Sequence, residues 1–149
     1  MSFQLQFIFW SDVNPQDCCY KINALSVYHF LLVFIGGGTG CCLRYSLGVI
    51  TFSHPKLFMV PTLLVNILAS CILGFLMYRY IAHPEKEWIR TLLMVGFCGG
   101  FSTFSAFSFE NFLLLRNGEW LWAAGYAMIS VIACLAAVAG GYFLSKLYW

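Results

Sequence analysis

Charge is what this sequence has least of. Only 9% of its 149 residues are charged, eight Lys and Arg against six Asp and Glu, whereas soluble domains carry about 25%. So few charges cannot cover a water-facing surface, and a hydrophobic fraction of 61% is too large to hide in one core of this size. The composition argues against a soluble globular protein and against disorder, and it favours an integral membrane protein.

Several functional patterns are missing as well. The sequence has no cluster of basic residues of the kind that binds nucleic acid. No Walker loop, H-E-x-x-H motif, nucleophile elbow or metal-ligand spacing occurs, which argues against nucleotide binding and against an enzyme. The seven cysteines form no C-x-x-C, and their odd number and vicinal pairs disfavour a disulfide framework. Five of them lie in apolar runs, where cysteine acts as a small hydrophobe: Cys41, Cys42, Cys71, Cys98 and Cys134.

Four apolar runs reach the roughly 20 residues that a membrane-spanning helix needs. They cover about residues 28–51, 57–80, 88–115 and 120–147, and short polar links join them. Because lipid offers the backbone no hydrogen bonds, they predict an all-α bundle of four transmembrane helices. The paired glycines Gly99-Gly100, followed by a Ser/Thr-rich stretch, predict a break in the third helix at that pair. Residues 1–27 form an N-terminal extension, whose role as an interfacial segment or a tail stays open.

The distribution of basic residues gives only a weak orientation. Five Lys and Arg fall on the side of the membrane that holds both termini, and three fall on the other side, counting Arg44. Cytoplasmic loops normally carry a clear excess. Insertion in both orientations, and hence an antiparallel dimer, is one hypothesis; a weakly biased protein with a single orientation is the alternative.

Polar side chains within the spans are few, and each has a functional and a structural interpretation. Arg44 is either a positive charge at the mouth of an anion path or a snorkelling anchor at the end of its helix. Thr62 and Asn66 share a face and can donate hydrogen bonds to a ligand or between helices. A third set of donors is spaced four residues apart on the last span: Tyr126, Ser130 and Cys134. This stripe is suggestive of a ligand path, and helix packing through small residues explains it almost as well.

The third span carries the most informative side chains. Phe104 and Phe107 share a helix face, and their electropositive ring edges can contact an anion or simply pack. Carbonyls freed at a helix break can coordinate a cation. Glu110, one turn further along the same face, is a lone carboxylate that needs a partner or water.

Three motifs occur in a fixed order. The first span reads G-G-x-x-G-C-x-x-R-Y from Gly36 to Tyr45, and the second reads P-T-L-L-V-N from Pro61 to Asn66. The third span reads G-x-x-G-G-F-S-T-F-S-A-F from Gly96 to Phe107, followed by Glu110, and the fourth has Y-x-x-x-S at residues 126–130. With these motifs, residues 28–147 resemble the Fluc (CrcB) family of bacterial fluoride ion channels.

The resemblance implies a passive fluoride-selective channel, formed by residues 28–149, that exports cytoplasmic fluoride across the bacterial inner membrane. It implies an antiparallel, dual-topology homodimer in the lipid bilayer, with two pores and a structural Na⁺ at the dimer centre. The implied pore residues are Phe104, Phe107, Asn66, Thr62, Tyr126 and Ser130. Arg44 would draw anions into the vestibule, Glu110 would lie beside the pore, and main-chain carbonyls of Gly99 and Ser102 would hold the Na⁺.

The sequence departs from the family pattern at several positions. Cys41 and Ala106 replace Ala and Thr, Pro61 and Ala69 each replace Gly, and Ser102 replaces Thr. Cys134 stands where some relatives have Ser, which leaves the outer end of the polar track open.

Two other classes of small four-span protein stay open as alternatives. A dual-topology multidrug exporter needs a membrane-buried Glu in its first span, and residues 28–51 contain no acidic residue. A four-span thiol oxidoreductase needs cysteine pairs in its loops, and only Cys18-Cys19 lies outside the spans.

Overall fold

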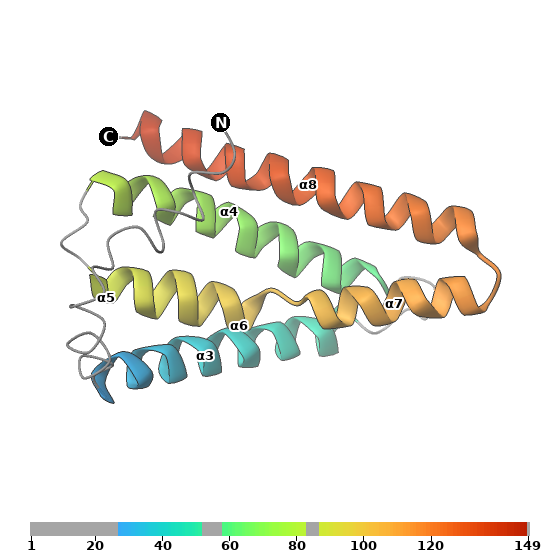
Figure 1. Ribbon diagram of the computed structural model, residues 1–149, viewed down its shortest axis with the longest axis horizontal. Coiled ribbons are helices and arrows are strands. Elements are labelled where there is room, and N and C mark those ends of the chain that lie inside the picture. Colours follow the sequence, from blue (N-terminus) through green and yellow to red (C-terminus); the bar gives the residue numbers. More distant parts are fainter. Residues whose placement is uncertain (1–26, 52–57, 83–86, 149) are drawn as a thin grey trace, which may run out of the picture.

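A computed structural model describes residues 27–51, 58–82 and 87–148, and most of these residues are helical. Three of the four long stretches are continuous helices: α3 (Val27–Thr51), α4 (Val60–Ala82) and α8 (Trp120–Leu147). The remaining stretch, which comes between α4 and α8 in the sequence, runs from Glu87 to Arg116 and is interrupted (Figure 1). All four stretches are long and apolar enough to span a membrane. The predicted spans are confirmed to within a few residues, and the predicted extension lies outside the described residues apart from the first residue of α3.

The interrupted stretch contains five segments. A short turn of helix, α5 (Glu87–Ile89), leads into the π-helical η2 (Arg90–Cys98) and then into α6 (Gly99–Phe101). Ser102 and Thr103 are extended, with ψ of 157° and 117°, and α7 (Phe104–Arg116) follows them. The prediction of a break at Gly99-Gly100 is therefore wrong in position, since both glycines are helical and the break comes after Phe101.

Packing explains why Gly100 stays helical. Helix α3 lies directly against η2 and α6, and a Cβ on Gly100 would overlap the carbonyl of Gly37 on α3. Helices α4 and α8 form the most extensive contact in the described bundle, and a Cβ on Gly74 would overlap the carbonyl of Val138. Small residues let membrane helices approach this closely. The glycine that was expected to break the helix thus serves helix packing.

The link between α7 and α8 has the hydrogen bonds of a Schellman motif. Glu119 N–H donates to the Leu114 carbonyl and Gly118 N–H donates to the Leu115 carbonyl, at 2.9 and 3.1 Å. Gly118 has a φ of 79°, the left-handed conformation that this motif requires and that glycine adopts without steric cost. The motif returns the chain, so that α8 packs back against α7 and α4.

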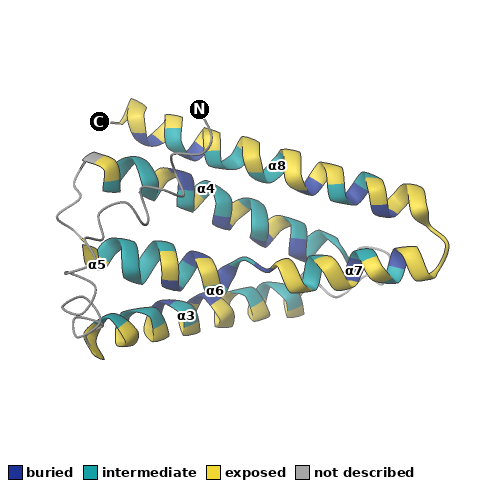
Figure 2. Ribbon diagram, viewed as in Figure 1, coloured by how far each residue is buried: buried dark blue, intermediate teal, exposed yellow. Residues whose placement is uncertain are grey.

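Apolar side chains lie both inside and outside the bundle. One buried cluster joins Phe101 with Val65 and Ala69 of α4, and it lies next to the helix break. The outer faces of α3 and α8 are largely exposed in the single chain (Figure 2), and their exposed residues are mostly large hydrophobics. An apolar surface of this extent marks contact with lipid or with another chain. The protein is a multi-pass membrane protein.

Candidate functional site

The helix break is held by one side chain from a different helix. Asn66 of α4 donates from Nδ2 to the carbonyl of Thr103 at 3.1 Å, and its Oδ1 accepts from the N–H of Thr103 at 2.8 Å. Both backbone groups of an extended, buried residue are thereby satisfied, as a membrane interior requires. Asn66 uses one of its two N–H bonds in this contact and keeps the other.

Thr103 also begins the next helix. Its Oγ1 accepts a hydrogen bond from Ala106 N–H at 3.2 Å and so caps the N-terminus of α7. Thr103 was not among the predicted site residues. Its signal was a threonine near the start of the Ser/Thr-rich stretch, a residue type that is favoured at helix N-termini.

The break also changes the environment of two carbonyls. In an unbroken α-helix the N–H of Thr103 would donate to Gly99, and the N–H of Ala106 would donate to Ser102. Here the first N–H goes to Asn66 and the second goes to the Thr103 hydroxyl. The two carbonyls that were predicted to hold Na⁺ are therefore among those that lose their helical donors at the break, and they suit a hard cation that prefers oxygen ligands.

Glu110 is the buried charged side chain of the described part of the chain, with 8% of its surface exposed. Thr62 Oγ1 donates to one carboxylate oxygen at 2.5 Å, and Tyr126 OH donates to the other at 2.7 Å. These three residues belong to α7, α4 and α8, so the carboxylate joins three helices near their meeting point. The sequence predicted that Glu110 needs partners, and the structure supplies two hydroxyls.

The two phenylalanines lie together as their spacing predicts. The ring centroids of Phe104 and Phe107 are 5.5 Å apart and the planes are tilted by 38°. The Phe107 ring is in turn 5.3 Å from the ring of Tyr126. Phe107 is partly buried, whereas Phe104 is 79% exposed in the single chain. The pair thus forms an aromatic edge that begins inside the bundle and reaches its surface.

A pocket of about 250 Å³ opens beside this aromatic edge. Four of the six predicted pore residues line it, namely Asn66, Phe104, Phe107 and Ser130. Its other lining residues are mostly small or polar: Ser70, Ser102, Thr103, Val131 and Cys134. The remaining two pore residues, Thr62 and Tyr126, are engaged with Glu110 and do not line this pocket.

Ser130 differs from the other hydroxyls of the predicted pore. It is 7% exposed, and its Oγ has no well-formed hydrogen bond to any described residue. A buried hydroxyl without a partner costs free energy, so such groups in a folded protein call for an explanation. Ser130 lines the pocket, and the hydroxyl of Tyr126 is a polar neighbour of its Oγ.

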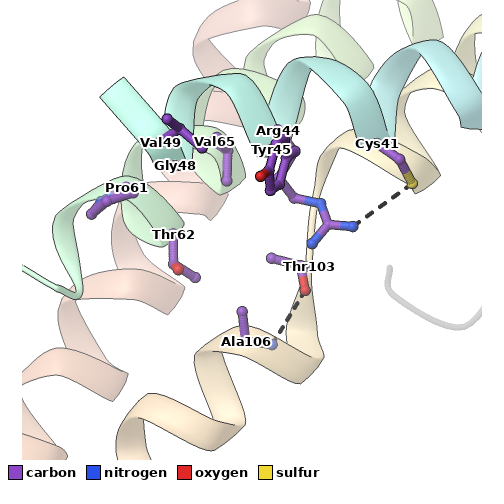
Figure 3. Close-up of a pocket in the computed structure, with 10 residues that line it drawn as sticks. All are labelled: Cys41, Arg44, Tyr45, Gly48, Val49, Pro61, Thr62, Val65, Thr103 and Ala106. Atoms are coloured by element: carbon purple, nitrogen blue, oxygen red, sulfur yellow. Dashed lines mark hydrogen bonds between the residues drawn. The ribbon is translucent and has the colours of Figure 1, made fainter. Parts of the chain in front are cut away.

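A second, larger groove of about 690 Å³ lies on the other side of the break, between α3, α4 and the start of α7 (Figure 3). Arg44 extends across this groove from α3, and its Nε donates to the carbonyl of Gly100 at 3.2 Å. Its Nη2 lies 3.7 Å from Cys41 Sγ, a contact that Figure 3 marks. Thr62 and Thr103 line the opposite wall. Arg44 therefore adds positive charge to an open groove that borders the helix break.

Comparisons with known proteins show which family the sequence matches. The sequence model of the CrcB-like proteins (Camphor Resistance, CrcB) matches residues 31–142. Three of the similar proteins carry the name fluoride-specific ion channel FluC. The one from Gloeothece citriformis is 40% identical over 117 residues, which is 78% of this chain and 95% of the relative. Those from Pyrococcus furiosus and Francisella tularensis are 44% and 42% identical, over 77% and 76% of this chain and 94% and 92% of the relatives.

Proposed function

The chain belongs to the CrcB (FluC) family, and on this premise we propose that it is a passive, fluoride-selective ion channel that exports cytoplasmic fluoride. The family points to a channel rather than an enzyme. The observation that carries the proposal is the pocket at the helix break, which is lined by polar hydrogen-bond donors and by two aromatic residues, Phe104 and Phe107. Export across the bacterial inner membrane is part of the same proposal.

The chemistry of the pocket suits a small anion. Fluoride is strongly hydrated, so a selective path must replace its water with donors held close by. The second N–H of Asn66 and the O–H of Ser130 are such donors. The edges of Phe104 and Phe107 add a weak positive potential without a charge that would trap the ion.

Thr62 and Tyr126 extend this polar track toward Glu110. In the proposal they are pore residues whose hydroxyls the carboxylate orients, and Glu110 is the acid beside the pore. Arg44 attracts anions into the larger groove, because its guanidinium carries five N–H donors and the described contacts use only a part of them.

The assembly we propose is an antiparallel, dual-topology homodimer with two pores. Its support is indirect: the pocket opens on a surface where Phe104 is 79% exposed, so one chain leaves the aromatic edge uncovered. A second copy would cover this edge and close the path. A closed two-fold dimer is the commonest small assembly.

We further propose a structural Na⁺ at the dimer centre, bound by the carbonyls of Gly99 and Ser102. Its support is the diversion of their helical donors to Asn66 and Thr103. Two carbonyls are too few for a complete coordination shell, and the antiparallel partner would contribute the same pair. Fluoride flux should then fall when the protein is purified and assayed with a larger organic cation in place of Na⁺.

The test is fluoride efflux from liposomes that contain the purified protein, with chloride efflux as the control. We expect rapid fluoride efflux without chloride efflux. Phe104→Ile and Asn66→Asp should each reduce the fluoride rate at least tenfold. Phe112→Ile is the matched control, because Phe112 is an exposed ring of the same helix that does not line the pocket. No fluoride flux from a well-folded dimer would refute the proposal.

A further inference from the structure

A third hollow, the outer groove, lies between the first turns of α4 and α8. Its volume is about 570 Å³, and its lining residues include Leu63 of α4 and Leu121, Trp122, Gly125 and Ile129 of α8. We propose that the outer groove is a binding site for one acyl chain of a membrane phospholipid. The inference depends on the membrane-spanning helices and goes beyond the proposed channel function.

The outer groove arises because α8 extends further along the bundle than α4. Gly74 of α4 packs against Val138 of α8, and this register places the start of α4 near Gly125. The first turns of α8 therefore continue past the end of α4 (Figure 1). Leu121 and Trp122 on these turns are 89% and 69% exposed, so the described residues leave them open to the surroundings. In a multi-pass membrane protein those surroundings include lipid.

The lining of the outer groove selects an apolar occupant. No charged side chain lines it, and the hydroxyl of Tyr126, which does line it, donates to Glu110 at 2.7 Å. The indole of Trp122 supplies one N–H in the first turn of α8, and tryptophan is enriched at the membrane interface. An ester carbonyl at the head of an acyl chain is a suitable acceptor for this N–H.

The size of the outer groove matches one acyl chain. At about 30 Å³ for each heavy atom, the share of one water molecule in the liquid, 570 Å³ holds about 19 heavy atoms. From Leu121 to Ile129 the groove follows α8 for about 12 Å, at 1.5 Å for each residue. One leaflet contributes about 15 Å to the hydrocarbon core of a bilayer. A chain that starts at Trp122 therefore lies along the groove within its own leaflet.

A bound chain would contact a residue of the proposed polar track. Tyr126 lines the outer groove, and its ring centroid lies 5.3 Å from that of Phe107. The ring is thus packed between Phe107 and the groove, and its hydroxyl reaches Glu110. An acyl chain in the groove would support this arrangement from the lipid side.

The test is photolabelling of the full chain in vesicles of phosphatidylethanolamine and phosphatidylglycerol. The probe is a phosphatidylglycerol with a diazirine in one acyl chain, and mass spectrometry locates the adducts after irradiation. Leu63 and Leu64 are compared, because Leu64 is 48% exposed and does not line the groove, whereas Leu63 is partly buried and does. Random contact with lipid labels Leu64 more strongly. A bound chain labels Leu63 more strongly, which is the result we expect.

Gly125→Phe fills the outer groove. A Cβ on Gly125 meets nothing within 4 Å, and the seven added heavy atoms take about 210 Å³, more than a third of the volume. Labelling of Leu63 relative to Leu64 should then fall at least threefold. Gly140→Phe is the matched control and should leave the ratio unchanged, since Gly140 lies on the same helix with nothing within 4 Å and does not line the groove.

Two outcomes would overturn the inference. One is equal or stronger labelling of Leu64 in the wild-type protein, which is also the result if a second copy of the chain fills the groove. The other is a labelling ratio that Gly125→Phe leaves unchanged. If Gly125→Phe does not fold, Gly125→Leu, which adds four heavy atoms, decides by the same comparison with a smaller expected loss. The readout involves no fluoride flux, so failure of the proposed function would leave this result intact.

Discussion

Removal of the Asn66 side chain tests whether this residue holds the helix break. In Asn66→Ala the N–H and the carbonyl of Thr103 both lose their partner, and Thr103 is only 9% exposed. An unsatisfied buried polar group costs about 1–3 kcal/mol, so two cost about 2–6 kcal/mol before any water enters the space left by the amide. Because that space adjoins an open pocket, we expect a loss near the lower end, about 2–3 kcal/mol.

The assay is the free energy of unfolding in detergent micelles, measured by denaturant titration under conditions where unfolding is reversible. Asn111→Ala is the matched control, since Asn111 makes a single hydrogen bond from Nδ2 to the carbonyl of Phe107 within its own helix. Its loss should stay below about 1 kcal/mol, the net value of one ordinary hydrogen bond. If the two variants differ by less than about 0.5 kcal/mol, Asn66 does not support the break, since a difference that small is within the scatter of ordinary surface changes.

Three further outcomes follow from the same contacts. Gly100→Ala places a methyl group against the α3 backbone and should lower the free energy of unfolding by about 1–3 kcal/mol. Gly38→Ala is the control and should not destabilise the protein, because nothing lies within 4 Å of that position. Equal thermal unfolding midpoints of the two variants would contradict the expectation. Ser130→Ala removes a hydroxyl that makes no well-formed hydrogen bond to the described residues, so the free energy of unfolding should not fall while fluoride efflux falls at least tenfold. A loss of stability together with the loss of efflux would contradict a role of Ser130 in conduction. Thr62→Val removes a hydrogen-bond donor from Glu110 and should lower the free energy of unfolding by about 1.5–3 kcal/mol. Thr62→Ser keeps the hydroxyl and should lose much less.

Those parts of the fold that depend on local composition were predictable. Apolar runs of sufficient length gave the four spans, and the three-residue spacing of Phe104 and Phe107 gave one aromatic face, which the ring distance of 5.5 Å confirms. A period of 3.6 residues and a minimum span length are properties of a single helix. They need no knowledge of what lies beside that helix.

The position of the break was not predictable in the same way. Glycines and a Ser/Thr run mark a region where a helix can break. Contacts with other helices determine which residue in that region leaves the helical conformation. Asn66, 37 residues away in sequence, satisfies Thr103, while close packing against Gly37 keeps Gly100 helical. Glu110 shows the same limit: its need for partners follows from burial of a charge, yet Thr62 and Tyr126 are supplied by two other helices.

The hydrogen bonds of the polar track divide it into two parts on the proposed path. A hydroxyl has one proton to donate, and those of Thr62 and Tyr126 point to the carboxylate oxygens of Glu110. An anion can take either donor only by displacing the carboxylate, so binding there is weaker than the donor count indicates. Among the described residues, neither Ser130 nor the second N–H of Asn66 donates to a carboxylate. Conduction requires sites that bind well enough to admit an ion and weakly enough to release it. We infer that Ser130 and Asn66 bind the ion well enough to admit it. We also infer that Glu110 weakens binding at Thr62 and Tyr126, so that the ion is released.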